Sequence, residues 1–187
     1  MKTICLMMLT LVVVTMSFGQ PREGRNFELS LSGSYQHYAS GSSSSGSGAL
    51  LVSPRLGYFV IKGLEVEPEI VFLFSSPGDP VYMANGNLSY NFISDRPAVP
   101  FVLLGYGIAN TVPVFGVPFT RTSFAIGVLN VGAGLKVFLH DDVALRLEYR
   151  YQAFTGEGED TNIGYYAYTH KVEAYIHTVQ FGFSVLL

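Results

Sequence analysis

The chain has 187 residues, of which 49% are hydrophobic and 13% are charged, about half the charged share of an average soluble domain. Its 11 Lys and Arg residues against 14 Asp and Glu residues give a net charge of −3, which, with the lack of a basic stripe, argues against a nucleic-acid partner. The aromatic and aliphatic content excludes a disordered chain. Beyond the N-terminal stretch, no run approaches the roughly 18 apolar residues of a membrane helix. A chain that is apolar enough for lipid but has no helical span favours a β-barrel.

The N-terminus has the layout of a signal peptide. Lys2 is followed by an apolar run and then by the small residues of a cleavage site that ends at Gly19. Cleavage there would remove Cys5, the single cysteine, so no disulfide or thiolate chemistry would remain. The sequence therefore predicts an exported protein with a signal peptide at 1–19 and one barrel domain at 20–187, and an uncleaved anchor helix is the alternative.

Eight segments of the mature chain alternate apolar and polar residues with a period of two, which indicates β-strands. Each is long enough for the roughly 9–11 residues of a tilted membrane strand. An even number of such segments is typical of an antiparallel up-and-down barrel. In chain order, the segments are 26–38, 49–60, 64–74, 81–92, 99–109, 123–139, 143–152 and 170–187.

The connections between these segments alternate in length. Outer-membrane barrels have short periplasmic turns and long extracellular loops, and with eight strands both termini fall on the periplasmic side. The Gly/Ser-rich composition of the first long connection and the polar, acidic composition of the last predict mobile loops. The short connections are 61–63, 93–98 and 140–142, and the long ones are 39–48, 75–80, 110–122 and 153–169.

Alternation alone does not say which face of the strands is inside, because a soluble, lipocalin-like barrel also alternates. A soluble barrel would fill its water-facing side with Lys and Glu. Here the polar face is mostly Ser, Asn, Gly and Gln, whereas the apolar face carries Tyr and Phe near the strand ends, as aromatic girdles do. The composition favours a transmembrane barrel with its polar face inward.

Three segments, 131–136, 143–151 and 177–184, resemble the small outer-membrane β-barrel domain family, the OmpA/OmpX-type barrels of Gram-negative bacteria. The strand pattern extends the resemblance over the whole mature chain. It implies an eight-stranded barrel in the outer membrane, in contact with outer-membrane lipid and lipopolysaccharide and inserted by the barrel-assembly machinery. The end of the chain matches the family's assembly signal, with Leu187 where the family often has Phe. The matching positions are Gln180, Gly182, Val185 and Leu187.

The resemblance does not imply one activity, because such barrels serve as anchors, adhesins, narrow pores, lipid-A enzymes and surface shields.

A cluster of charged residues is expected to face the lumen. It could line a selective pore or form an acid–base pair, but an eight-stranded interior is just wide enough to be filled by side chains, which favours a salt-bridged plug. Three Glu at alternate positions of one strand lie about 6.8 Å apart, too far for all three to bind one metal ion. The cluster consists of Arg55, Glu65, Glu67, Glu69, Lys136, Arg146, Glu148 and Arg150.

No motif supports an enzyme or a cofactor. A lipid-A acyltransferase or deacylase would keep a His with a Ser and a carboxylate near the extracellular strand ends, where His37 and His170 could meet Ser40, Ser42 or Glu157, but their spacing matches no known pattern. The acidic stretch in the last long connection lacks the spacing of an EF-hand. We therefore expect a non-enzymatic protein with a structural role or an unknown surface partner.

The pattern also predicts one strand register. A three-residue turn at 61–63, with glycine last, would pair Val60 with Leu64 and would set Arg55 directly opposite Glu69 in the lumen. Slipping by one residue would instead turn three Glu side chains toward lipid.

Overall fold

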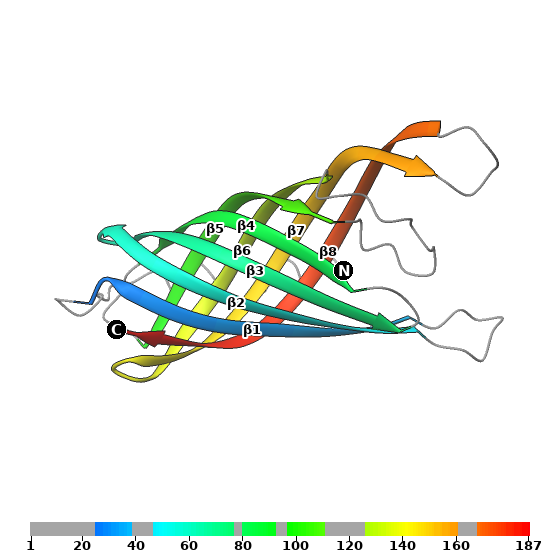
Figure 1. Cartoon of the computed structure of the whole chain (residues 1–187). Coiled ribbons are helices and arrows are strands. Elements are labelled where there is room, and N and C mark those ends of the chain that lie inside the picture. Colours follow the sequence, from blue (N-terminus) through cyan, green and yellow to red (C-terminus); the bar gives the residue numbers. More distant parts are fainter. Residues whose placement is uncertain (1–24, 39–46, 77–79, 93–96, 111–125, 161–167) are drawn as a thin grey trace, which may run out of the picture.

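The computed structural model describes residues 25–38, 47–76, 80–92, 97–110, 126–160 and 168–187. Eight antiparallel strands form one closed barrel in which each strand pairs with its neighbours in sequence and β8 pairs with β1 (Figure 1). The strands are β1 (Phe27–Tyr38), β2 (Ser47–Ile61), β3 (Leu64–Ser76), β4 (Val81–Asn91), β5 (Ala98–Ala109), β6 (Ile126–His140), β7 (Val143–Asp160) and β8 (Tyr168–Leu186).

The two ends of the barrel differ. At one, here called the turn end, β2 passes directly into β3 and β6 into β7, and the chain terminates after β8. The other, here called the loop end, is where β1, β3, β5 and β7 finish, on the right of Figure 1. The eight strands agree with the sequence prediction, but the predicted alternation of connection length fails at one place, because the connection 77–80 between β3 and β4 is shorter than the connection 92–97 between β4 and β5.

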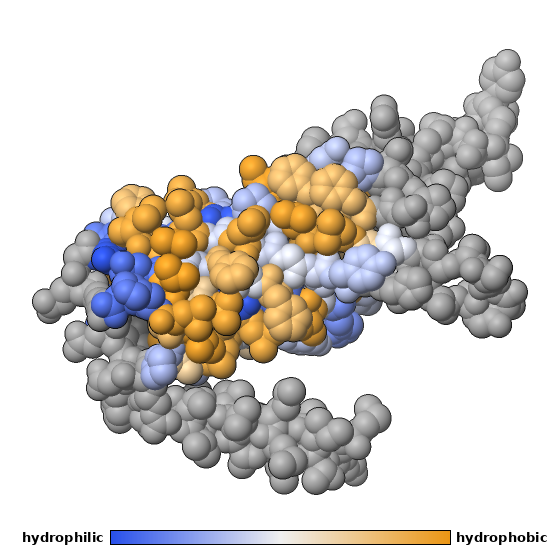
Figure 2. All heavy atoms as spheres, turned by 90° about the horizontal axis from the view of Figure 1, so that it is seen from below, coloured by the Kyte–Doolittle hydropathy of each residue, from blue (hydrophilic) through white to orange (hydrophobic). Residues whose placement is uncertain are grey.

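The alternation places one apolar face of each strand on the outside of the barrel. Leu56, Val66, Leu104 and Val131 are outward-facing and exposed, and apolar atoms cover much of the visible wall between the two ends (Figure 2). Aromatic rings such as Tyr90 lie on the same outer surface. In the described part of the chain, no helix is long and apolar enough to cross a membrane.

The β7–β8 hairpin is longer than its sequence pattern indicates. The stretch 153–169 was predicted to be a loop, but β7 continues to Asp160 and β8 begins at Tyr168, with Gly156 paired with Val172 and Asp160 with Tyr168. The prediction was wrong because backbone hydrogen bonds between two paired strands continue where apolar alternation stops. The stretch 39–46 lies outside the described residues.

The β2–β3 turn corrects the predicted register at one point. Arg55 pairs with Glu69, as expected, but Ile61 pairs with Leu64 over a two-residue turn, where Val60 with Leu64 was predicted. A two-residue turn alone would set inward-facing residues of β2 opposite outward-facing residues of β3. The register shift between Phe59 and Ile61 prevents this mismatch. Gly63 has a φ of 83°, a left-handed conformation that glycine adopts readily.

The β6–β7 turn uses the same device. His140 pairs with Val143, and the register shifts between Phe138 and His140. Both turns therefore keep their polar faces in phase through a bulge.

Candidate functional site

All eight charged residues predicted to face the lumen are buried inside the barrel. None is more than 3% exposed, and ionised side chains at such burial need partners. They lie in the turn-end half of the lumen, where Glu28 of β1 joins them. We call these nine residues the charged network.

Four members of the charged network form a closed ring of alternating charge across the lumen. Arg55 of β2 contacts Glu69 at 2.8 Å and Glu148 at 2.6 Å. Arg150 of β7 contacts the same two carboxylates, each at 2.6 Å. Arg55 also donates to the side-chain oxygen of Gln180 on β8 at 2.7 Å. The ring therefore connects β2, β3 and β7 through the interior, and the hydrogen bond to Gln180 adds β8.

Arg146 and Lys136 connect this ring to the turn end. Arg146 lies 3.0 Å from Glu148, 2.9 Å from Glu67 and 3.6 Å from Glu28. Lys136 lies 2.7 Å from Glu28 and 2.9 Å from Glu65.

The ring of Phe101 on β5 lies beneath both cations, 4.4 Å from the Arg146 guanidinium and 5.6 Å from the Lys136 ammonium. Desolvated cation–π contacts of this kind are worth up to about 2 kcal/mol.

Neutral side chains complete the charged network. The amides of Asn85 and Asn87 on β4 both donate to Glu69, at 3.0 and 2.9 Å, and the Ser53 hydroxyl donates to the same carboxylate. The two Asn side chains lie over Gly107 and Gly105 of β5, where a Cβ would come within 2.0 Å of each amide oxygen. Glycine at these β5 positions makes room for the network.

Glu28 is the network member that the sequence analysis did not single out. It is 1% exposed and bonds Lys136, and its neighbour Ser30 donates to it at 2.9 Å. It is the lone charge among the buried residues of β1, where Ser30, Ser32 and Ser34 are the others, so it did not form a cluster in sequence. Its place on the polar face of β1 was the available signal.

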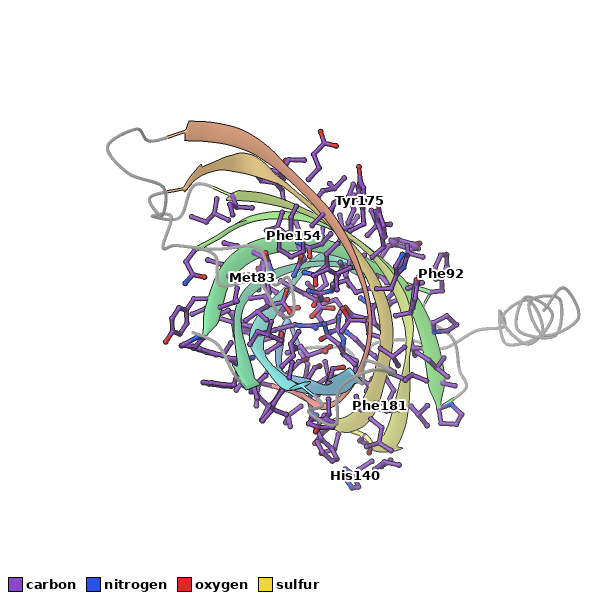
Figure 3. All side chains as sticks on the ribbon, turned by 90° about the vertical axis from the view of Figure 1, so that its right-hand side faces the viewer. Met83, Phe92, His140, Phe154, Tyr175 and Phe181 are labelled. Carbon is purple, nitrogen blue, oxygen red and sulfur yellow. The ribbon has the colours of Figure 1, made fainter. Side chains whose placement is uncertain are left out.

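The loop-end half of the lumen is apolar, which the predicted polar interior did not anticipate. Met83 and Phe154, for example, are 2% and 0% exposed and lie among the side chains that fill the space inside the strands (Figure 3). Between the two halves, Gln152 donates to Asn130 at 2.8 Å. The apolar cluster consists of Ala49, Leu51, Val71, Leu73, Val81, Met83, Ala109, Ile126, Val128 and Phe154, with Ala174 and Ile176 packed against it.

In the described part of the lumen the buried charges largely neutralise one another, and no reactive side chain has an evident catalytic role. With five Glu and four cations, the network is nearly balanced, and the carboxylates face Arg or Lys. Among the described residues, no three His, Cys, Asp or Glu side chains are grouped as a metal site would require. The side chains of His37, His170 and Glu157, and residues Ser40 and Ser42, lie outside the described part of the structure.

His177 is on the outer surface of β8. Its Nδ1 lies 2.6 Å from the Tyr149 hydroxyl of β7, which satisfies a polar group on a wall otherwise lined by apolar side chains. Its ring centroid also lies 5.2 Å from that of Tyr151.

The residues of the expected assembly signal divide between the two faces of β8. Gln180 and Gly182 point inward, while Val185 and Leu187 point outward. The side chain of Gln180 accepts a hydrogen bond from Arg55 inside the barrel.

Comparison with known proteins identifies the family. A model of the outer membrane protein beta-barrel domain matches residues 8–185. The chain belongs to this family. This outer-membrane barrel is also similar in fold to the crystal structure of Neisserial surface protein A, with a TM-score of 0.58 and 17% identity over 86% of this chain and 97% of that one.

A second structural neighbour is the N-terminal β-barrel domain of Pseudomonas aeruginosa OprF, with a TM-score of 0.58 and 15% identity over 88% of this chain and 100% of that one. No curated protein sequence matches the chain significantly. Family and fold together place the protein in the outer membrane, which excludes the soluble, lipocalin-like alternative.

Proposed function

We propose that this outer-membrane barrel is a non-enzymatic, non-conducting protein that presents its loop end at the cell surface, in a structural role or for interaction with another molecule. The observation that carries the proposal is the filled lumen, in which a charged network and an apolar cluster follow one another along the axis. An ion would have to separate buried pairs and then cross an apolar layer, and both steps are costly.

Conductance in planar lipid bilayers tests this proposal. We expect the wild-type protein to show no steady open pore. A large, stable conductance would contradict the proposal and favour the narrow-pore alternative. A lipid-modifying enzyme is the other alternative, and it predicts a mass change in lipid A between cells with and without the protein.

The proposed partners are outer-membrane lipid and lipopolysaccharide around the wall and an unidentified surface partner at the loop end. One structural neighbour is described as a surface protein, which agrees with a role at the cell surface. Cysteine labelling of intact cells tests the orientation. Cysteine at Ser44 should react with an impermeant reagent, whereas labelling at Lys62, in the β2–β3 turn, would invert the topology.

We also infer that the barrel-assembly machinery inserts the protein through the signal at Gln180, Gly182, Val185 and Leu187. Deletion of 183–187 removes the two apolar positions of that signal and should leave the protein degraded in the periplasm. Normal membrane levels of the truncated chain, measured by immunoblot of separated membranes, would contradict this inference.

A further inference from the structure

The buried charges of the lumen do not balance. The charged network contains four cations, Arg55, Lys136, Arg146 and Arg150, and five carboxyl groups, those of Glu28, Glu65, Glu67, Glu69 and Glu148. If all nine were ionised, the lumen would hold one negative charge in excess. No other charged side chain among the described residues is buried, so none of them offsets it. A buried group without a counter-charge is costly to ionise and tends to become neutral instead.

Three of the five carboxyl groups are well paired. Glu148 accepts hydrogen bonds from three arginines, and Glu69 accepts from two. Both oxygens of Glu67 accept from Arg146, at 3.4 and 2.9 Å. These three groups are therefore the ionised partners of the arginines.

Lys136 is shared by the other two carboxyl groups, at the turn end. Its ammonium lies 2.7 Å from Glu28 and 2.9 Å from Glu65. Glu28 has further partners, because the Ser30 hydroxyl donates to it at 2.9 Å and the Arg146 guanidinium lies 3.6 Å away. Within the described part of the chain, Glu65 forms an ion pair with Lys136 alone. The excess negative charge therefore falls on these two carboxyl groups, and Glu65 is the less well compensated of them.

The two oxygens of Glu65 have different surroundings. Oε2 accepts hydrogen bonds from Lys136 at 2.9 Å and from the Asn91 amide at 3.0 Å. Oε1 is buried and has no hydrogen-bond partner among the described residues. It lies over Gly57 of β2, so closely that a Cβ there would collide with it. An ionised oxygen needs donors, whereas a protonated one can remain buried at a much lower cost.

The charged groups around Glu65 repeat the imbalance of the whole network. The contacts from β2 and β4 are neutral, since they come from Gly57 and Asn91. The charged groups that face Glu65 are Lys136 of β6, Arg146 of β7, Glu28 of β1 and Glu67 of its own strand. Two cations thus serve three carboxyl groups in this corner, counting Glu65 itself.

We propose that Glu65 is a buried proton-binding site, whose carboxyl group carries a proton on Oε1 in the folded barrel at neutral pH. The proton comes from water as the strands close, and it leaves four carboxylates to balance four cations. Lys136 then neutralises Glu28 while it still donates to Oε2 of Glu65. Glu65 is the second residue of β3, and the apolar cluster fills the loop-end half of the lumen. Exchange of this proton with water should therefore occur through the turn end.

Infrared spectroscopy tests the proposal, because a protonated carboxyl group has a C=O band that an ionised carboxylate lacks. Vesicles of ether-linked lipid are used, since they have no ester carbonyl of their own. We expect the wild type at neutral pH to show one such band, which shifts in heavy water. Glu65→Gln should lack the band. Glu173→Gln, which removes an exposed carboxylate of β8, should keep it.

Two spectra would overturn the proposal. One is a wild-type spectrum without a protonated-carboxyl band, and this spectrum decides even if a variant fails to insert. The other is a Glu65→Gln spectrum that keeps the band, since the proton would then belong to another group.

The pH dependence of unfolding gives a second test. The folded protein would hold one proton that an unfolded Glu65 releases above about pH 5. The unfolding equilibrium constant of the wild type should therefore rise about tenfold per pH unit between about pH 5.5 and about pH 7. Glu65→Gln should lack this contribution while sharing every other. Urea unfolding from lipid vesicles measures both, and an identical pH dependence would contradict the site.

Comparison with a second carboxyl group of β3 gives the third test. Glu69→Gln makes the same substitution two inward positions further along the strand, where it leaves Arg55 and Arg150 short of a counter-charge. Loss of a buried partner should raise its unfolding constant roughly a hundredfold or more at neutral pH. Glu65→Gln replaces one neutral group with another and should raise the constant by less than about tenfold. Equal losses would mean that Glu65 is ionised in the folded protein.

Discussion

In the turn-end half of the lumen the inward side chains are charged and reach across the barrel, whereas in the loop-end half they are apolar and pack against near neighbours. Arg55, for example, contacts Glu69 on the adjacent strand and Glu148 on β7, while Leu51, on the same strand, belongs to the apolar cluster. The two halves share eight strands and one alternation. The turn-end half is held by paired charges and the loop-end half by apolar packing, so substitutions in the two halves should destabilise the protein in different ways.

In the charged network each group has specific partners, so removal of one leaves others unpaired. In the apolar cluster no contact is specific, and removal of one side chain leaves a cavity whose cost depends on how far neighbours relax. The following variants separate these two behaviours.

The largest effect is expected from Arg55→Ala. It leaves two carboxylates of the four-residue ring short of a cation and removes the hydrogen bond to Gln180. Breaking a buried pair by removing one partner costs about 3–5 kcal/mol, measured as the free energy of unfolding in urea from lipid vesicles. Arg55→Lys, which keeps the charge but loses the forked geometry, should recover part of the loss. Equal losses for the two variants would contradict a role for the charge.

The apolar half is tested by Leu51→Ala against Leu50→Ala, two neighbours on opposite faces of β2. Leu51 is 4% exposed inside the barrel, and Leu50 is 47% exposed toward lipid. Truncating Leu51 should cost about 2–5 kcal/mol because a cavity remains. Lipid fills the space left by Leu50, so that variant loses the transfer contribution without a cavity. A larger loss for Leu50→Ala would show that the loop-end lumen is loosely packed.

The fold was predictable because alternation and connection length carry most of its information. The eight strands, the inward position of the charged residues and the Arg55–Glu69 pair all follow from the alternation of apolar and polar residues along the chain. The apolar half of the lumen did not follow, because stretches such as 50–52 and 71–74 are apolar on both faces, and a period of two cannot then say which side is inside.

Other features depend on contacts that a strand pattern does not contain. The bulges before Ile61 and before His140 cannot be predicted from the alternation, because a two-residue turn with a bulge and a three-residue turn both keep the polar faces of the two strands on the same side. The Glu28–Lys136 contact joins strands that are distant in sequence. The length of β7 depends on which strand edges meet, and no alternation predicts that.

A smaller effect is expected where the network depends on a missing side chain. Gly105→Ala would place a Cβ 2.0 Å from the amide oxygen of Asn87 and would displace that amide from Glu69, at a cost of about 1–3 kcal/mol for overpacking. Gly86→Ala is the matched control, because its Cβ would point outward with its nearest contact at 4.0 Å. Urea unfolding of both variants checks the difference. Similar stabilities would mean that the contact between Asn87 and Glu69 does not depend on glycine at position 105.

The smallest effect is expected from Arg25→Ala, which breaks an ion pair outside the lumen. Arg25 contacts Asp142 of the β6–β7 turn, and the two side chains are 35% and 32% exposed, so water and salt screen the pair. Such pairs contribute about 0–1 kcal/mol. The stabilisation lost in Arg25→Ala should also shrink as salt is raised, because exposed charges are screened within about 10 Å at 0.1 M. The loss in Arg55→Ala should change little with salt, because its partners are buried. If both losses responded equally to salt, ions would have access to the charged network, and the proposal of a closed, non-conducting lumen would be wrong.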